Sequence, residues 1–97
     1  MRTYELMFIV RPEVDEEALN AIVDRVQQIM TANAGEVQKV DRMGRRRLAY
    51  PIKRYKDGHY VLIQAGLEQP AIAEVERDLK LSEDVIRHLL IRIDEGE

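Results

Sequence analysis

Segments with strand periodicity alternate with segments of helical periodicity along this chain, and their order limits the folds that it can adopt. Four segments have the apolar pattern of strands, and they lie at 4–10, 36–52, 59–67 and 85–93. Two further segments, 16–32 and 69–80, repeat apolar residues at helical spacing. The sequence therefore predicts the order strand, helix, strand, strand, helix, strand.

This order predicts the architecture of a single domain. Two helices of similar length are enough to cover one face of a four-stranded sheet. Right-handed crossovers in both strand–helix–strand halves then give an antiparallel sheet of the α+β class, the ferredoxin-like plait, whose other face carries no helix. A chain of 97 residues can bury one hydrophobic core but not two, so we expect residues 1–97 to form one domain.

Local signals predict where several elements begin, bend and end. Asp15 suits a helix N-cap, and Gly35 is predicted to take the left-handed conformation that ends this helix. Gly44 permits a bulge or a sharp bend in the second strand, and Pro51 marks that strand as an edge strand. The dipeptide Asp57-Gly58 is predicted to form the turn into the third strand, which is apolar on both faces and is expected to be central.

One basic segment stands out from an otherwise acidic chain. Residues 42–56 carry seven cations and no acid, and they are Arg42, Arg45, Arg46, Arg47, Lys53, Arg54 and Lys56. Because the whole chain has a formal net charge of −3, the remaining residues together carry −10. A positive patch on an acidic domain indicates contact with a polyanion at one place. The alternative is a solvated segment whose charges keep a sheet edge from aggregating.

The basic segment also has a two-residue period. Leu48, Tyr50 and Ile52 share one parity, so their side chains are predicted to lie under the helices, with Tyr50 in a structural role. Arg45 and Arg47 have the opposite parity and are predicted on the helix-free face. The segment is therefore expected to be an edge strand or a hairpin that carries charge beyond the sheet.

The sequence lacks the residue patterns of an enzyme or of a metal site. It contains no cysteine, and His59 and His88 have no partner at the spacing of metal ligands. Ser82 is the single serine and has no nucleophile-elbow context, and no glycine-rich phosphate loop is present. The turn at Arg11-Pro12 lacks the glycines that an anion cradle needs. We predict a non-catalytic protein with no cofactor, no metal and no small-molecule substrate.

No part of the sequence predicts contact with a membrane. No apolar run approaches the length of a membrane span, and the start, M-R-T-Y-E-L, lacks the apolar core of a signal peptide. A cytoplasmic domain is therefore expected. The last residues, Asp94 to Glu97, are acidic and are expected to fray.

Nucleic-acid binding is the remaining class of function, and the aromatic residues limit its mode. Plait domains that bind single strands on the open sheet face stack bases on strand aromatics. Here that face would offer Tyr60 together with Met7, Ile9 and Leu62, which is a poor stacking platform. Phosphate contacts from the basic segment to a folded RNA are predicted instead. The apolar residues of the open face are either ordinary strand formers or the docking surface of a protein partner.

Several motifs along the chain resemble those of one protein family. They are R-T-Y-E at 2–5, M-G-R-R-R-L-A-Y-P-I-K at 43–53, G-H-Y at 58–60 and V-I-R-H at 85–88. With these motifs the chain resembles the bacterial small-subunit ribosomal protein S6 family over almost its whole length. The segment G-R-R-R-L-A-Y-P-I is highly specific to that family, whereas the plait is not.

The resemblance implies a non-catalytic component of the platform of the small ribosomal subunit. Members of the family pair with the small-subunit protein S18, and the two together bind the central domain of small-subunit rRNA during assembly. By resemblance, the candidates for contacts to RNA or to this partner are Arg2, Arg45, Arg46, Arg47, Lys53, Arg54, Lys56, Arg87 and Arg92. A protein-interaction module, with the basic run as an edge guard only, is the alternative from another class.

Overall fold

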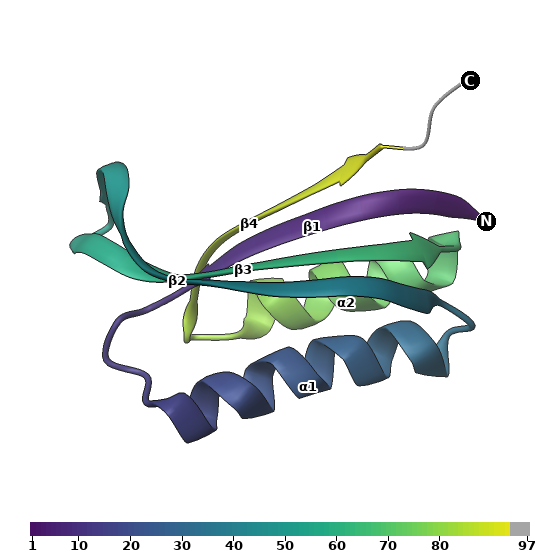
Figure 1. Ribbon diagram of the computed structural model, residues 1–97, viewed down its shortest axis with the longest axis horizontal. Coiled ribbons are helices and arrows are strands. Elements are labelled where there is room, and N and C mark those ends of the chain that lie inside the picture. Colours follow the sequence, from purple (N-terminus) through teal and green to yellow (C-terminus); the bar gives the residue numbers. More distant parts are fainter. Residues whose placement is uncertain (94–97) are drawn as a thin grey trace.

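The computed structural model describes residues 1–93, which form a four-stranded antiparallel sheet with two helices on one face (Figure 1). The elements are β1 (Arg2–Val10), α1 (Glu16–Ala32), β2 (Glu36–Ile52), β3 (Tyr55–Leu67), α2 (Gln69–Leu81) and β4 (Val85–Arg92). The strand order across the sheet is β2-β3-β1-β4. This is the ferredoxin-like plait that the sequence predicts, with β3 central and the proline-bearing β2 at an edge. The predicted acidic tail, 94–97, lies outside the described residues.

The hydrophobic core lies between the sheet and the two helices. Alternate residues of β1 and β3 point toward the helices and are almost fully buried, and they are Leu6, Phe8, Val10, Val61, Ile63, Ala65 and Leu67. The helices contribute Val23, Val26 and Met30 of α1 and Val75 and Leu79 of α2. Within residues 1–93, no polar or charged residue is buried. The charged residues are therefore left to the helix surfaces, the strand ends and the helix-free face of the sheet.

Helix α1 begins where the sequence predicts but ends differently. Asp15 caps it, because its Oδ1 accepts a hydrogen bond of 2.8 Å from the backbone N–H of Ala18. At the other end Ala34, with φ 66°, takes the left-handed conformation that was predicted for Gly35. A Cβ on Gly35 would lie 2.7 Å from the carbonyl oxygen of Met30. The glycine is therefore needed for the close passage of the chain under the helix end, and not for its φ angle.

The turn between β2 and β3 is not at the predicted dipeptide. Ile52 pairs with Tyr55, so the chain turns at Lys53 and Arg54, and Lys53 has a positive φ of 58°. Gly58 instead lies inside β3, where an added Cβ would stand 2.6 Å from Cγ2 of Ile9 and 2.8 Å from the carbonyl oxygen of Val10. An Asp-Gly pair is a strong turn signal, but this glycine allows β3 to approach β1 closely.

A candidate nucleic-acid interface

Past the end of β1, β2 and β3 continue as a two-stranded hairpin, which we call the basic arm (residues 45–56). The pairing of β2 with β3 is interrupted between Arg42 and Gly44, and Gly44 has a φ of 89°. This bulge, which the sequence predicts, bends the ribbon. Figure 1 shows the arm curving away from the helices, toward the helix-free side of the sheet. Its cations are thereby carried past the packed layer.

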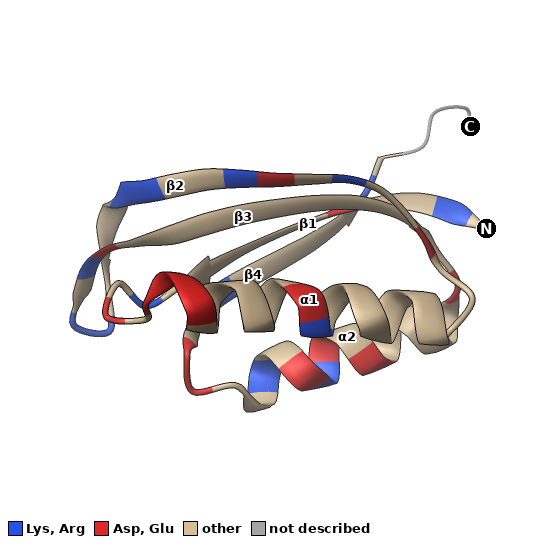
Figure 2. Ribbon diagram, turned by 60° about the horizontal axis from the view of Figure 1, so that its bottom comes forward, with Lys and Arg blue, Asp and Glu red and all other residues tan. Residues whose placement is uncertain are grey.

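The structure brings most of the predicted contact residues together. Six of them lie on the arm, and they are Arg45, Arg46, Arg47, Lys53, Arg54 and Lys56. Arg87 of β4 reaches the arm directly, because its Nη1 lies 3.0 Å from the phenolic oxygen of Tyr50. Arg2 and Arg92 are not in this group, since they lie at the far ends of β1 and β4. Figure 2 shows Lys and Arg on the arm and Asp and Glu at the start of α1.

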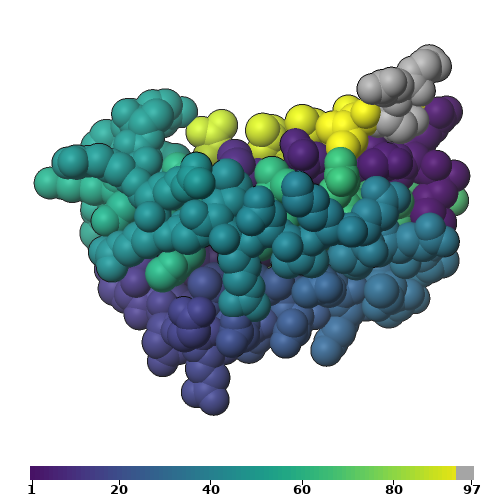
Figure 3. Space-filling view, viewed as in Figure 1, coloured from purple at the N-terminus to yellow at the C-terminus, as the bar shows by residue number. Residues whose placement is uncertain are grey.

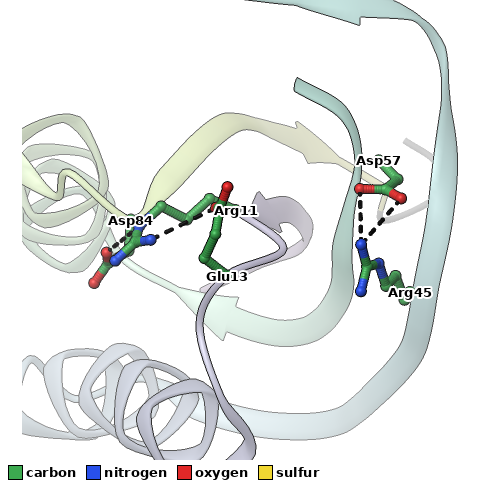
Figure 4. A network of polar contacts seen from close by, with 5 residues as sticks. All are labelled: Arg11, Glu13, Arg45, Asp57 and Asp84. Atoms are coloured by element: carbon green, nitrogen blue, oxygen red, sulfur yellow. Dashed lines mark hydrogen bonds and ion pairs between the residues drawn. The ribbon is translucent and has the colours of Figure 1, made fainter. Parts of the chain in front are cut away.

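Three arginines at the base of the arm are engaged by the protein itself. Nη2 of Arg45 lies 3.3 Å from Oδ2 of Asp57 on the facing strand (Figure 4). Nε of Arg46 donates a hydrogen bond of 3.3 Å to the carbonyl oxygen of Met43. Arg42, just before the arm, donates to Oδ1 of Asn20 in α1. These contacts hold the arm to itself and to the domain, but only the pair of Arg45 with Asp57 reduces the charge that a ligand would meet, because the acceptors of Arg46 and Arg42 are neutral.

The remaining cations of the arm have no acidic partner. In the described part of the chain, no ion pair is formed by Arg47, Lys53, Arg54 or Lys56. All four side chains are exposed, and the guanidinium of Arg54 lies 5.5 Å above the ring of Tyr55. An exposed cation without a partner contributes nothing to the fold through pairing. These four residues and Arg46, whose hydrogen bond is to a neutral carbonyl, therefore supply the charge that the arm can offer to a polyanion.

The prediction for Tyr50 is wrong. Its side chain is 59% exposed, and the buried residue of the same parity, Leu48, packs with Ile9 and Ile86 on the helix-free side of the sheet. After the register shifts between Val37 and Lys39 and between Arg42 and Gly44, Arg45 and Arg47 pair with His59 and Asp57, which share the parity of the helix-facing residues of β3, so Leu48 and Tyr50 take the opposite side. Arg45 and Arg47, of opposite parity to Leu48, therefore leave the ribbon on the side away from that face, contrary to the prediction.

An apolar groove lies between the arm and the sheet. It has a volume of about 240 Å³ and is lined by Met7, Ile9, Leu48, Ala49, Tyr50, Ile52, Tyr60, Arg87, His88 and Leu89. In the space-filling view a notch separates the arm from β4 (Figure 3). Leu89 and Ile91 of β4 are 47% and 43% exposed on the same helix-free side. The groove and these two side chains are the apolar part of the helix-free face beside the arm, with Arg87 at the groove and Glu5 paired opposite Ile91.

Arg11 lies in the turn after β1 that was considered above as a possible anion-binding loop. Its guanidinium is paired with acidic residues of the protein itself. Its Nε lies 2.7 Å from Oδ1 of Asp84, and its Nη1 lies 3.6 Å from Oε1 of Glu13 (Figure 4). The hydrogen bond to Asp84 raises the pKa of the Arg11 guanidinium. This contact joins the loop after β1 to the start of β4. Arg11 is therefore a structural residue.

Residues 1–93 contain neither a cluster of metal ligands nor a membrane-spanning helix. No group of three or more His, Cys, Asp or Glu side chains within residues 1–93 is arranged to hold a metal ion. Neither helix in this range has the length and apolar character to cross a membrane. The arm and the helix-free face beside it are therefore the candidate functional surfaces.

Comparison with known proteins decides the family. The model of the family "Ribosomal protein S6" matches residues 3–92. The chain belongs to this family. The S6 family assignment made from the motifs is thus confirmed, and it places the chain among the proteins of the small ribosomal subunit.

Individual relatives agree with the family assignment. The small ribosomal subunit protein bS6 of Desulforamulus reducens is 44% identical over 97 residues, which is the whole of both chains. That of an Exiguobacterium species is 48% identical over 89 residues, or 92% of this chain and 94% of the relative. Among solved structures, 30S ribosomal protein S6 of Thermotoga maritima has a TM-score of 0.89 at 35% identity, over 95% of this chain and 87% of that one. Because these S6 relatives are structural proteins of the ribosome, the prediction of a non-catalytic protein is confirmed.

Proposed function

We propose that this protein binds the central domain of small-subunit rRNA through the basic arm, next to ribosomal protein S18, during assembly of the small subunit in the cytoplasm. The observation that carries the proposal is the set of exposed cations on the arm that form no ion pair within residues 1–93, which are Arg46, Arg47, Lys53, Arg54 and Lys56. Arg and Lys contacts to phosphate supply most of the affinity of such an interface and position the nucleic acid.

The distribution of charge supports an RNA contact confined to the arm. The first turn of α1 carries Glu16 and Glu17, and α2 exposes Glu74. Phosphates brought to these helix surfaces would be repelled, whereas the arm curves away from the helices (Figure 1). The arm therefore offers RNA an approach that avoids the acidic side of the domain.

The helix-free face supports a protein partner next to the RNA. Its groove is apolar, and the exposed Leu89 and Ile91 extend the apolar surface along β4. The chain has a net charge of −3, so a basic partner such as S18 would be attracted to it. Arg87 lies where the two surfaces meet, on β4 and in contact with Tyr50 of the arm. A partner on this face would extend the positive surface that RNA meets.

The test is the affinity of this chain for a central-domain rRNA fragment, measured with and without S18 over a series of salt concentrations. We expect weak binding by the chain alone and tight binding with the partner, because the preassembled surface leaves less to be ordered on binding. A steep salt dependence is expected, since phosphate contacts release counterions. Equal affinity with and without S18 would contradict the cooperative part of the proposal. An affinity that does not change with salt would favour a protein-interaction module.

A further inference from the structure

A second hollow lies within the basic arm, and it shares Leu48, Ala49 and Tyr50 with the groove on the helix-free face. Arg47 pairs with Asp57 and Ile52 pairs with Tyr55, so four residues of β2, at 48–51, stand opposite the single residue Lys56 of β3. The hollow formed by this bulge has a volume of about 230 Å³ and is lined by Arg47, Leu48, Ala49, Tyr50, Pro51 and Lys56.

The lining of this hollow combines positive charge with an exposed flat ring. Arg47 and Lys56 are exposed and have no ion-pair partner in the described chain. Tyr50, the aromatic residue of this lining, is 59% exposed, and Pro51 beside it is exposed as well. This exposed ring, which lines the same hollow as the two cations, does not pack in the core. The ring and the cations together are, however, the combination with which proteins hold one nucleotide, with the base on the ring and the phosphate on the cations.

The ring of Tyr50 is also held in place. Its phenolic oxygen accepts a hydrogen bond of 3.0 Å from Nη1 of Arg87, which comes from β4 outside the arm. This contact anchors the polar edge of the ring and leaves the faces of the ring to other partners. A ring fixed before binding loses less conformational freedom when a base stacks on it. Arg87 is in this respect a positioning residue for Tyr50.

We propose that this hollow is a subsite for one unpaired RNA nucleotide, with its base stacked on Tyr50 and its phosphate held by Arg47 and Lys56. The proposal rests on the proposed rRNA-binding function and adds the conformation of the RNA that the arm selects. A paired base in a helix hides its faces in the stack, so duplex RNA would offer the arm phosphates and sugar hydroxyls only. The arm would then distinguish a bulged or looped nucleotide from a continuous helix.

The experiment compares the unaltered full-length chain, with S18 present, against four variants on the central-domain rRNA fragment across a salt series. Tyr50→Leu should weaken binding by roughly 5- to 150-fold, the range for loss of one stacked base, without changing the salt slope. Tyr50→Phe keeps the ring and should restore most of the affinity. Arg47→Ala and Lys56→Ala should each lower the slope by about 0.7–0.9, as expected for one lost phosphate contact.

Two controls separate stacking from a structural or partner-binding role. The affinity of Tyr50→Leu for S18 without RNA should equal that of the unaltered chain. With a fully paired two-stranded RNA duplex of the same length as probe, Tyr50→Leu and the unaltered chain should bind equally.

Three outcomes would contradict the proposed subsite. If the rRNA fragment binds with a steep salt slope but Tyr50→Leu binds it as tightly as the unaltered chain, the subsite is wrong and the rRNA-binding function stands. If Tyr50→Leu loses affinity for S18 instead, the ring is a partner contact and the subsite is wrong. If the unaltered chain and S18 do not bind the fragment at all, both proposals fail.

Discussion

The phenolic oxygen of Tyr50 accepts a hydrogen bond from Nη1 of Arg87 at 3.0 Å, and this contact ties the tip half of the arm to β4. The two residues are 37 positions apart in the chain. Leu48 forms the second attachment, because it is buried with Ile9 and Ile86 under the arm. The arm is thus a hairpin attached to the helix-free face at two points, and Lys53 and Arg54 form the turn at its tip.

The cations of the arm are expected to differ in their effect on RNA binding. Replacing Arg45, Arg46 and Arg47 together with Ala should weaken binding and leave the core intact, and most of the effect should come from Arg46 and Arg47, which form no ion pair within residues 1–93. Arg45→Ala removes a partner of Asp57, and such an exposed pair contributes only about 0.2–1 kcal/mol to stability. The measurement is the salt dependence of rRNA affinity for the single variants. Arg77→Ala in α2 is the matched control and should bind normally; a larger loss for Arg45→Ala than for Arg47→Ala would refute the division.

The core role belongs to Phe8 and not to Tyr50. Phe8 has 0% exposure, so Phe8→Ala should lower the free energy of unfolding by roughly 3–5 kcal/mol. Tyr50→Ala removes an exposed ring and one hydrogen bond, so its cost should be about 1 kcal/mol or less. Denaturant titration of both variants gives the comparison. Equal losses would show that the ring of Tyr50 packs in solution.

Replacing Ala34 with glycine should stabilise the protein. A non-glycine residue in the left-handed region costs roughly 1–2 kcal/mol, and the added freedom of glycine in the unfolded chain returns about 0.4–1 kcal/mol of this. A net gain of about 0.5–1 kcal/mol in the free energy of unfolding is therefore expected. Ala32→Gly, two residues earlier and still in α1, is the control and should destabilise. Destabilisation by both variants would contradict the left-handed cap.

Gly58 and Gly66 are expected to differ in their tolerance of a methyl group. In Gly58→Ala the new Cβ would meet the backbone oxygen of Val10 at 2.8 Å, which cannot move without disturbing β1. The variant should lose about 1–3 kcal/mol, the usual cost of overpacking. In Gly66→Ala the contact at 2.8 Å is Sδ of Met1, the end of a flexible side chain, so the loss should be smaller. Thermal unfolding of the two variants would reveal any reversal of this order.

The sequence identified most of the residues of the candidate site, but it did not show how they are arranged or which of them pair with each other. The density of cations at 42–56 and the family motifs identify the arm. They do not distinguish Arg45, which is paired with Asp57, from Arg47, which has no ion pair in the described chain. That difference depends on which side chains face each other across the hairpin. Tyr50 was predicted in the core because it shares parity with the apolar Leu48 and Ile52, but that apolar face lies against the helix-free side of the sheet.

The sequence by itself determined the order of the elements, the face of each helix and of β1 and β3 that is buried, and the cap at Asp15. These features follow from periodicity and from hydrogen bonds within a few residues, so they need no knowledge of distant parts of the chain. Only the tertiary structure decided the role of Gly58, the exposure of Tyr50 and its bond to Arg87. Each of these depends on how closely two strands approach or on a register shift at Gly44, which are properties of segments brought together by the fold.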